Sequence, residues 1–182
     1  MSTAPALIRR ATVDDAPLLA EFGARTFHDA FGADNDPADM AQYVAAAFSV
    51  ETIAAELRDP AAAFLLALAR TRDGEHPVGY AKLLTGVAHA AVSGDRALQL
   101  SRLYVDATAI GSGHGSTLMR ACLDEARIGG FATVWLGVWE HNARALGFYE
   151  RWGFEVVGSQ QFVLGADVQT DLVMARPLTA PD

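Results

Sequence analysis

The chain has 182 residues, enough for one compact domain, expected over residues 1–182, that needs neither disulfides nor a metal to hold its core. Hydrophobic residues make up 51% and charged residues 20%, which excludes an intrinsically disordered chain. The formal net charge of −8 argues against nucleic-acid binding, which needs a basic surface; it fits attraction of a cationic substrate or simply a soluble, acidic surface.

The first third of the chain predicts a short strand, residues 6–10, followed by three helices. Ser, Thr and Asp side chains can accept hydrogen bonds from the free N–H groups of a helix's first turn. Such a residue precedes each of three amphipathic stretches. In the second stretch a proline, Pro37, directly follows the capping residue and occupies the first helical position. The predicted helices and their caps are residues 12–31 with Thr12, residues 36–48 with Asp36, and residues 49–58 with Ser49.

An antiparallel hairpin is predicted next. Residues 63–70 are an apolar run of strand length, and residues 78–84 resume the pattern. Asp73, Gly74 and Pro77 between them indicate a turn, so the two strands would be joined by five to seven residues.

The third strand of this region, residues 97–105, follows a turn at residues 93–95 and has an interrupted alternation. Its apolar residues occupy one phase at Leu98 and Leu100 and the other phase at Leu103 and Val105. A slip of one residue is what a β-bulge produces, so a bulge is predicted near Ser101 or Arg102.

The last part of the chain alternates helices and strands. Residues 133–138 are apolar on both faces, which is typical of a central parallel strand. The full order is β-α-α-α-β-β-β-α-β-α-β-β, which predicts an α/β or α+β fold with a mixed sheet. The remaining predicted elements are a Gly-rich loop over 110–116, a helix to about residue 128 ended by Gly129–Gly130, a helix capped by Asn142 and ended by Gly153, and strands at 154–163 and 168–175.

The Gly-rich loop, Gly-Ser-Gly-His-Gly-Ser-Thr at residues 111–117, lies between a strand and a helix. Free N–H groups at a helix start bind anions, and glycine allows a phosphate to approach the main chain. No lysine follows the glycines, which excludes a P-loop. The glycine spacing and the apolar Trp135–Leu136 about twenty residues on exclude a dinucleotide-binding fingerprint.

Two motifs together resemble the GNAT superfamily of N-acetyltransferases. The strand at 97–105 with its Gly-His-Gly turn and helix is similar to the superfamily's acetyl-CoA-binding motif, usually written Gln/Arg-x-x-Gly-x-Gly/Ala. Residues 142–154, Asn-Ala-Arg-Ala-Leu-Gly-Phe-Tyr-Glu-Arg-Trp-Gly-Phe, are similar to its second motif, Asn-x-x-Ala-x-x-Phe-Tyr-x-x-x-Gly-Phe. The resemblance covers nearly the whole chain. It implies antiparallel N-terminal strands, a splayed parallel pair at the centre and helices on both faces.

A narrower resemblance is to the PaiA-type polyamine N-acetyltransferases. It rests on Leu-Ser-Arg-Leu-Tyr-Val at 100–105, Val-Trp-Leu-Gly-Val-Trp-Glu-His-Asn at 134–142 and Gln-Thr-Asp-Leu at 169–172. This resemblance implies spermidine, spermine or a similar small amine as the acceptor and acetyl-CoA as the cosubstrate. A homodimer is common in the family.

The resemblance also implies where acetyl-CoA binds. Its pantetheine arm would lie between the strands at 97–105 and 133–138, paired with backbone groups as an added strand would be. Its pyrophosphate would meet the N–H groups of the Gly-rich turn. The residues expected to contact it are Leu103, Tyr104, Val105, Gly111, Ser112, Gly113, His114, Gly115, Ser116, Asn142 and Tyr149.

Catalytic roles are expected for two side chains. Tyr149 is the candidate general acid for the CoA sulfur, because a phenol stays protonated at neutral pH. Glu140, directly after the central strand, is the candidate base, although a solvated loop carboxylate is an equally good interpretation. Asp171 and Tyr43 are candidates for the lining of the amine pocket. The histidines are too dispersed for metal-ligand spacing, so no metal is expected.

Three functions stay open at this point. Ile110 stands at the Gln/Arg position of the first motif, and Gln99 and Ser101 stand where the family often has acidic residues. These departures leave a non-catalytic CoA-binding sensor as an alternative. An acetyltransferase for a protein N-terminus or an antibiotic amine is another.

The expected location is the cytoplasm, with no membrane partner. Residues 1–10 lack a cationic segment followed by an apolar run, so no signal peptide is expected. The longest apolar stretch, residues 61–69, is too short to span a bilayer.

Overall fold

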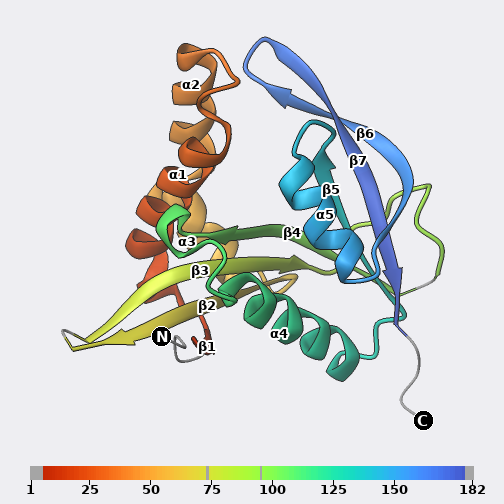
Figure 1. Ribbon diagram of the computed structural model, residues 1–182, viewed down its shortest axis with the longest axis horizontal. Helices are drawn as coiled ribbons and strands as arrows, with labels where there is room; N and C mark the ends of the chain where they lie inside the picture. The colour runs from red at the N-terminus through yellow and green to blue at the C-terminus, as the bar shows by residue number, and fades with distance from the viewer. Residues whose placement is uncertain (1–5, 73, 95, 179–182) are drawn as a thin grey trace.

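The computed structural model describes residues 6–72, 74–94 and 96–178, and its elements follow the predicted order (Figure 1). Asp73 and Asp95, from the two predicted turns, lie outside the described residues. The elements are β1 Leu7–Arg10, η1 Val13–Asp15, α1 Ala16–Phe31, α2 Pro37–Ala47, α3 Val50–Arg58, β2 Ala62–Thr71, β3 Gly74–Leu84, β4 Ala97–Val105, η2 Ala107–Ala109, α4 His114–Ile128, β5 Thr133–Trp139, α5 Ala143–Arg151, β6 Glu155–Leu164 and β7 Asp167–Pro177, where η marks a 3₁₀ turn.

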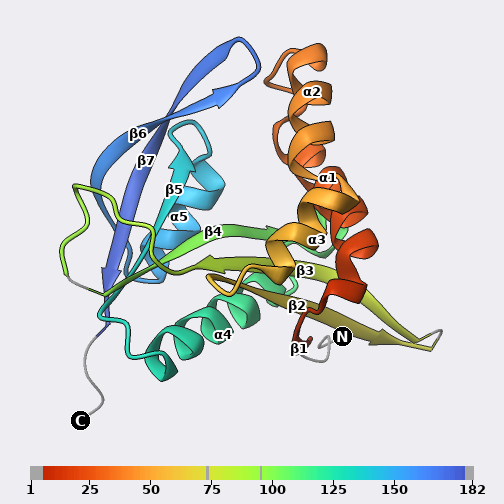
Figure 2. The same ribbon diagram turned by 180° about the vertical axis from the view of Figure 1, so that it is seen from behind.

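The described strands form one mixed sheet in the order β1-β2-β3-β4-β5-β7-β6. Every neighbouring pair in it is antiparallel except β4 and β5, which are parallel. Helices α1 and α3 lie on one side of the sheet and α4 on the other (Figures 1 and 2). The predicted fold class is therefore confirmed.

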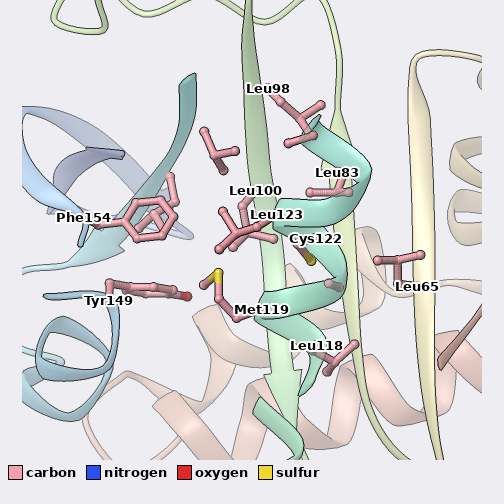
Figure 3. Close-up of a cluster of buried hydrophobic side chains, with 14 of the residues drawn as sticks. Leu65, Leu83, Leu98, Leu100, Leu118, Met119, Cys122, Leu123, Tyr149 and Phe154 are labelled. Atoms are coloured by element: carbon pink, nitrogen blue, oxygen red, sulfur yellow. The ribbon is translucent and has the colours of Figure 1, made fainter. Parts of the chain in front are cut away.

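The pleat of β2 shows how the sheet separates two layers of core. Leu65 and Ala67 belong to the cluster around α4, whereas Phe64, Leu66 and Leu68 belong to the cluster around α1 and α3. Because successive strand residues point to opposite faces, one apolar run supplies both cores. Figure 3 shows the α4 side, with Leu65 and Leu83 beside the helix.

The helix starts are the ones that the polar caps predict. Asp36 accepts hydrogen bonds from the N–H groups of Ala38 and Asp39, and Ser49 accepts one from Thr52. At the first helix the Asp15 carboxylate accepts from the Thr12 N–H at 2.8 Å, but the first turn is a 3₁₀ turn and α1 begins only at Ala16.

The predicted hairpin connection is wrong, because β3 begins at Gly74 rather than at residue 78. Pairing of β2 with β3 continues to Thr71 opposite Gly74, and Pro77 lies inside the strand opposite Leu68. Proline is tolerated there for two reasons. The register shifts next to it, and β4 pairs with β3 only from Gly79 onwards, so one side of β3 needs no N–H donor at Pro77.

The predicted bulge in β4 is confirmed and coincides with the parting of two strands. Arg102 pairs with Lys82 but Leu100 pairs with the adjacent Leu83, so Ser101 is the extra residue. Pairing of β4 with β5 covers only residues 97–99 and 133–135, and the strands diverge beyond this point. A bulge bends its strand and increases the local twist, which accounts for the divergence.

The described residues provide no membrane-spanning helix, no metal site and no reactive cysteine. None of these helices has the length and apolar character that crossing a bilayer requires. No three His, Cys, Asp or Glu side chains gather there as metal ligands would. Cys122 is a buried core residue of α4, and burial raises the pKa of its thiol to about 12, so the thiolate nucleophile is suppressed.

Candidate active site

A cleft of about 700 Å³ opens where β4 and β5 part. One half is lined by β4, the loop after it, the first turn of α4, and α5. The other half is lined by α1, α2, the end of β5 and the β6–β7 hairpin. The two halves differ in chemistry: the first offers backbone groups and arginines, and the second offers aromatic rings and carboxylates.

The free edge of β4 forms one wall of the first half. Leu103 and Val105 pair with Ala81 and Gly79 of β3 on one side, while beyond Gln99 the other side has no strand partner among the described residues. Both residues line the cleft, as does Tyr104, whose ring contacts Phe27 of α1. The predicted backbone edge is therefore present and open.

The Gly-rich turn closes this half at one end. Gly111 and Gly113 have φ values of +86° and +87°, a conformation that side-chain-bearing residues rarely adopt. Gly113 is the N-cap of α4, and no described residue accepts a hydrogen bond from the N–H groups of residues 113–116. These donors are therefore available to an anion.

Two residues of this turn predicted to contact acetyl-CoA, Ser112 and His114, do not line the cleft. The N–H of Ser112 is already bonded to the carbonyl of Ala109 at 3.2 Å, and Ser112 does not line the cleft. His114 is buried in the first turn of α4, and its side chain does not line the cleft either. Gly111, Gly113, Gly115 and Ser116 do line it.

Helix α5 supplies the remaining predicted residues of this half. The Asn142 side chain accepts a hydrogen bond from the Ala145 N–H at 3.1 Å, which confirms its capping role, and it also lines the cleft. Tyr149, further along α5, also lines the cleft, and its ring packs against the Phe154 ring with the centroids 5.8 Å apart. Its hydroxyl points toward Met119 of α4 (Figure 3).

The electrostatic state of Tyr149 suits an acid. Burial raises the pKa of its phenol, so the group is protonated throughout the neutral range. Within the described residues its hydroxyl forms no hydrogen bond, which leaves its proton available.

The second half of the cleft has an aromatic wall that the sequence did not reveal as a unit. Phe27 of α1 is its centre, with Phe31 and Tyr43 each 4.8 Å away between ring centroids. Phe162 of β6 lies 5.4 Å from Tyr43, and Trp139 of β5 lies 6.2 Å from Phe31. All five rings line the cleft.

Two contacts between distant segments hold this wall together. Gln169 of β7 donates a hydrogen bond to the side chain of Asn35 in the loop between α1 and α2. Gly165, in the turn between β6 and β7, lies against Asp39 of α2. The tip of the β6–β7 hairpin thereby lies beside α2 (Figure 1).

Asp171, predicted as a pocket residue, lines this half. Burial raises its pKa to about 6, and a hydrogen bond from Gln160 opposes the rise. Tyr43, the other predicted pocket residue, also lines it, and burial raises the pKa of its phenol.

Glu140, the predicted base, is not brought into the cleft. Its side chain is 41% exposed in the loop after β5, with one oxygen 3.9 Å from the His141 Nε2. Glu140 lies in the turn after β5 and, unlike Gly137, Val138 and Trp139, is not among the residues that line the cleft.

A buried ion cluster supports the bulged part of β4. The Glu56 carboxylate of α3 lies 2.6 Å from Lys82 Nζ and 2.8 Å from an Arg102 nitrogen. Arg102 is also 5.0 Å from the Phe48 ring centroid and lines the cleft. One carboxylate thus compensates two largely buried cations, directly beside Ser101.

Comparisons with known proteins agree with this geometry. The model of the family described as "Acetyltransferase (GNAT) family" matches residues 25–154. An uncharacterized N-acetyltransferase of Mycobacterium tuberculosis is 38% identical over 164 residues, which are 90% of this chain and 98% of that protein. One of Lactobacillus delbrueckii is 32% identical over 164 residues, which are 90% of this chain and 92% of that protein.

Solved structures show the same fold at lower identity. The PaiA N-acetyltransferase of Thermoplasma acidophilum, in complex with coenzyme A, has a TM-score of 0.73 at 19% identity, covering 95% of this chain and 99% of that one. A ribosomal-protein-alanine N-acetyltransferase of Brucella melitensis has a TM-score of 0.64 at 22% identity, covering 94% and 99%. At this identity the likeness shows the fold.

Proposed function

The chain belongs to the acetyltransferase (GNAT) family, and on that premise we propose that it transfers the acetyl group of acetyl-CoA to a primary amine of a polyamine or similar small alkylamine. Two unlike half-sites meet in one cleft at the point where β4 and β5 part, and this observation carries the proposal. The first half of the cleft, with the open edge of β4 and the Gly-rich turn, is called the backbone half and suits acetyl-CoA. The second half, with the aromatic wall, is called the aromatic half and suits an alkylamine.

The residues of the backbone half fit a phosphopantetheine thioester. The open edge of β4 at Leu103 and Val105 pairs with the amides of the pantetheine arm, as with an added strand. The unpaired N–H groups of residues 113–116 hold the pyrophosphate at the start of α4. Arg144 and Arg151 of α5 also line the cleft and add positive charge that attracts the phosphates.

Tyr149 completes this half as the general acid. Tyr149 lines the cleft, and its protonated hydroxyl has no competing partner among the described residues, so it donates its proton to the departing CoA sulfur. Holding amine and thioester in contact supplies much of the remaining acceleration, worth several kcal/mol.

The aromatic half fits an alkylamine of the polyamine type. Its rings contact the methylene groups of the acceptor, and their faces attract an ammonium group. Asp171 and Asp29 are the carboxylates that line the cleft among the described residues, and both attract a cation. The PaiA resemblance and the net charge of −8 point the same way.

An acceptor screen tests this proposal. The protein is incubated with saturating acetyl-CoA and, separately, spermidine, propylamine, a peptide with an N-terminal alanine, and an aminoglycoside, and release of free thiol is followed. Spermidine is expected to have a kcat/KM at least about tenfold above that of the peptide, because the peptide lacks a second ammonium and its backbone amides would be desolvated against aromatic rings.

Two results would redirect the assignment. A higher kcat/KM for the peptide or the aminoglycoside contradicts the polyamine acceptor. Calorimetric binding of acetyl-CoA without thiol release for any acceptor favours the non-catalytic sensor.

A further inference from the structure

Removing the proton from the acceptor requires a base, because an alkylammonium has no lone pair for the thioester. Glu140 does not line the cleft, and β4 carries Gln99 and Ser101 rather than carboxylates there. Among the described residues two carboxylates line the cleft. Asp29 is exposed on α1, whereas Asp171 on β7 is partly buried inside the aromatic half.

Three strands fix the position of Asp171. It pairs across the sheet with Trp139 of β5 on one side and Gln160 of β6 on the other. A Cβ placed on Gly137 of β5 would lie 3.2 Å from the Asp171 Oδ2 and 2.6 Å from the Gln160 Nε2. The missing side chain of Gly137 is therefore what leaves room for the carboxylate and the amide above β5.

This position faces the gap between the central strands. Gly137 lies two residues beyond Trp135, the last residue of β5 that pairs with β4. Asp171 thus lies over the part of β5 that borders the opening, on the acceptor side of the cleft. Tyr43 of α2 is close to it, since the charge of Asp171 contributes to the raised pKa of the Tyr43 phenol.

We propose that Asp171 is the general base of the acetyl transfer and that Gln160 positions it, an inference that rests on the function proposed above. The Asp171 carboxylate takes one proton from the bound ammonium and passes it to water. The freed nitrogen lone pair forms the bond to the thioester carbonyl carbon, and the carbon–sulfur bond breaks with its electron pair on sulfur. Tyr149 gives its proton to that sulfur and recovers the second proton from the nitrogen.

The charge state of Asp171 is compatible with this role. Its pKa, raised to about 6 by burial, leaves the carboxylate ionised at neutral pH and more basic than an exposed one. Three groups around the Asp171 carboxylate carry no charge: Tyr43 on α2, which stays protonated, Gln160 on β6 and Trp139 on β5. Two charged groups line the same cleft, Asp29 on α1 and Arg102 on β4. The Arg102 guanidinium is held by Glu56 and therefore already compensated.

Asp171→Asn tests the inference in the full chain. With spermidine, kcat/KM is expected to fall about 100-fold at pH 7.5. The wild-type profile should rise with pH through about 6, since only the ionised carboxylate accepts a proton, and this limb should be absent from the variant. An acceptor amine of low pKa should reduce the defect to less than about tenfold, because it reaches the site already neutral.

Stability and cosubstrate binding separate a lost base from a damaged fold. The folded-state pKa of Asp171 lies above its ordinary value, so ionising it costs stability as pH rises from about 4 to about 6, and the cost is complete above that range. Asp171→Asn should therefore unfold at an equal or higher temperature than the wild type at pH 8. The acetyl-CoA Kd should be unchanged.

Two more variants complete the experiment. Gly137→Ala displaces the carboxylate without removing it and should also lose most of the activity. Glu155→Gln, an exposed carboxylate at the start of the same hairpin, should keep kcat/KM within about twofold of wild type. Asp171→Asn with wild-type activity, or with the pH limb near 6 retained, overturns the inference even when the wild type acetylates amines. Absence of turnover by the wild type with every amine overturns the proposed function itself.

Discussion

Replacing Tyr149 by phenylalanine is expected to lower kcat about 100-fold while leaving the acetyl-CoA Kd within about twofold of the wild-type value. The ring is packed between Phe148, Phe154 and the residues of α4, and phenylalanine fills the same space. The hydroxyl has no hydrogen-bond partner among the described residues, so its removal costs no intramolecular bond. Only the proton for the leaving sulfur is lost. Steady-state kinetics with spermidine and calorimetry with acetyl-CoA measure the two quantities.

Tyr80→Phe is the matched control for this variant. Tyr80 is fully buried in the α1–α3 core, its hydroxyl also has no partner in the described part of the chain, and it does not line the cleft. Its replacement should leave kcat unchanged and stability equal or slightly higher, because a buried, unbonded hydroxyl is removed. Equal kcat values for the wild type and Tyr149→Phe would remove Tyr149 from the mechanism.

Glu56→Gln is expected to destabilise the protein by about 3 kcal/mol, the lower end of the cost of breaking a buried ion cluster. Lys82 and Arg102 have side-chain exposures of only 8% and 13%, and Glu56 is the carboxylate that contacts both. Without its charge, two cations stay buried close together. Burial already lowers the pKa of Lys82, which shows how unfavourable its environment is for a charge.

Urea unfolding at pH 7 measures this loss as a shift of the midpoint at constant slope. Glu51→Gln, an exposed carboxylate in the first turn of the same helix, is the matched control and should cost less than about 1 kcal/mol, the contribution of a charge near a helix N-terminus. A loss for Glu56→Gln no larger than that of Glu51→Gln would contradict the assignment of the cluster to the stability of the fold.

The backbone half of the site could be predicted from the sequence because its signals are local. The phase change between Leu100 and Leu103 predicted the bulge near Ser101 or Arg102, and the glycines before α4 predicted the free N–H groups. Asn142 and Tyr149 lie on one short helix whose cap and stop are visible in the sequence. In each case the information lies within about ten residues of the chain.

The acceptor half could not be predicted in the same way, because its residues come from segments far apart in the sequence. Phe27, Tyr43 and Phe162 meet only when the β6–β7 hairpin faces α2. The space for Asp171 depends on Gly137 and Gln160, which lie on two other strands.

Glu140 and Pro77 show the same limit of sequence patterns. Glu140 directly follows a residue that lines the cleft, but it lies in the turn after β5 with an exposed side chain and does not line the cleft. Proline usually indicates a turn, yet Pro77 lies in a strand whose second side has no strand partner at that position among the described residues. In both cases the outcome depends on the tertiary surroundings of the residue, which the local sequence does not contain.

Amide hydrogen exchange with and without saturating acetyl-CoA tests most directly whether the parted strands and the tip of α4 grip the cosubstrate. Exchange is expected to slow at Leu103 and Val105 and at residues 113–116, because their N–H groups gain partners, and to stay unchanged in the distal part of the β2–β3 hairpin. Unchanged exchange at residues 103–105 and 113–116, with acetyl-CoA demonstrably bound, would contradict this account.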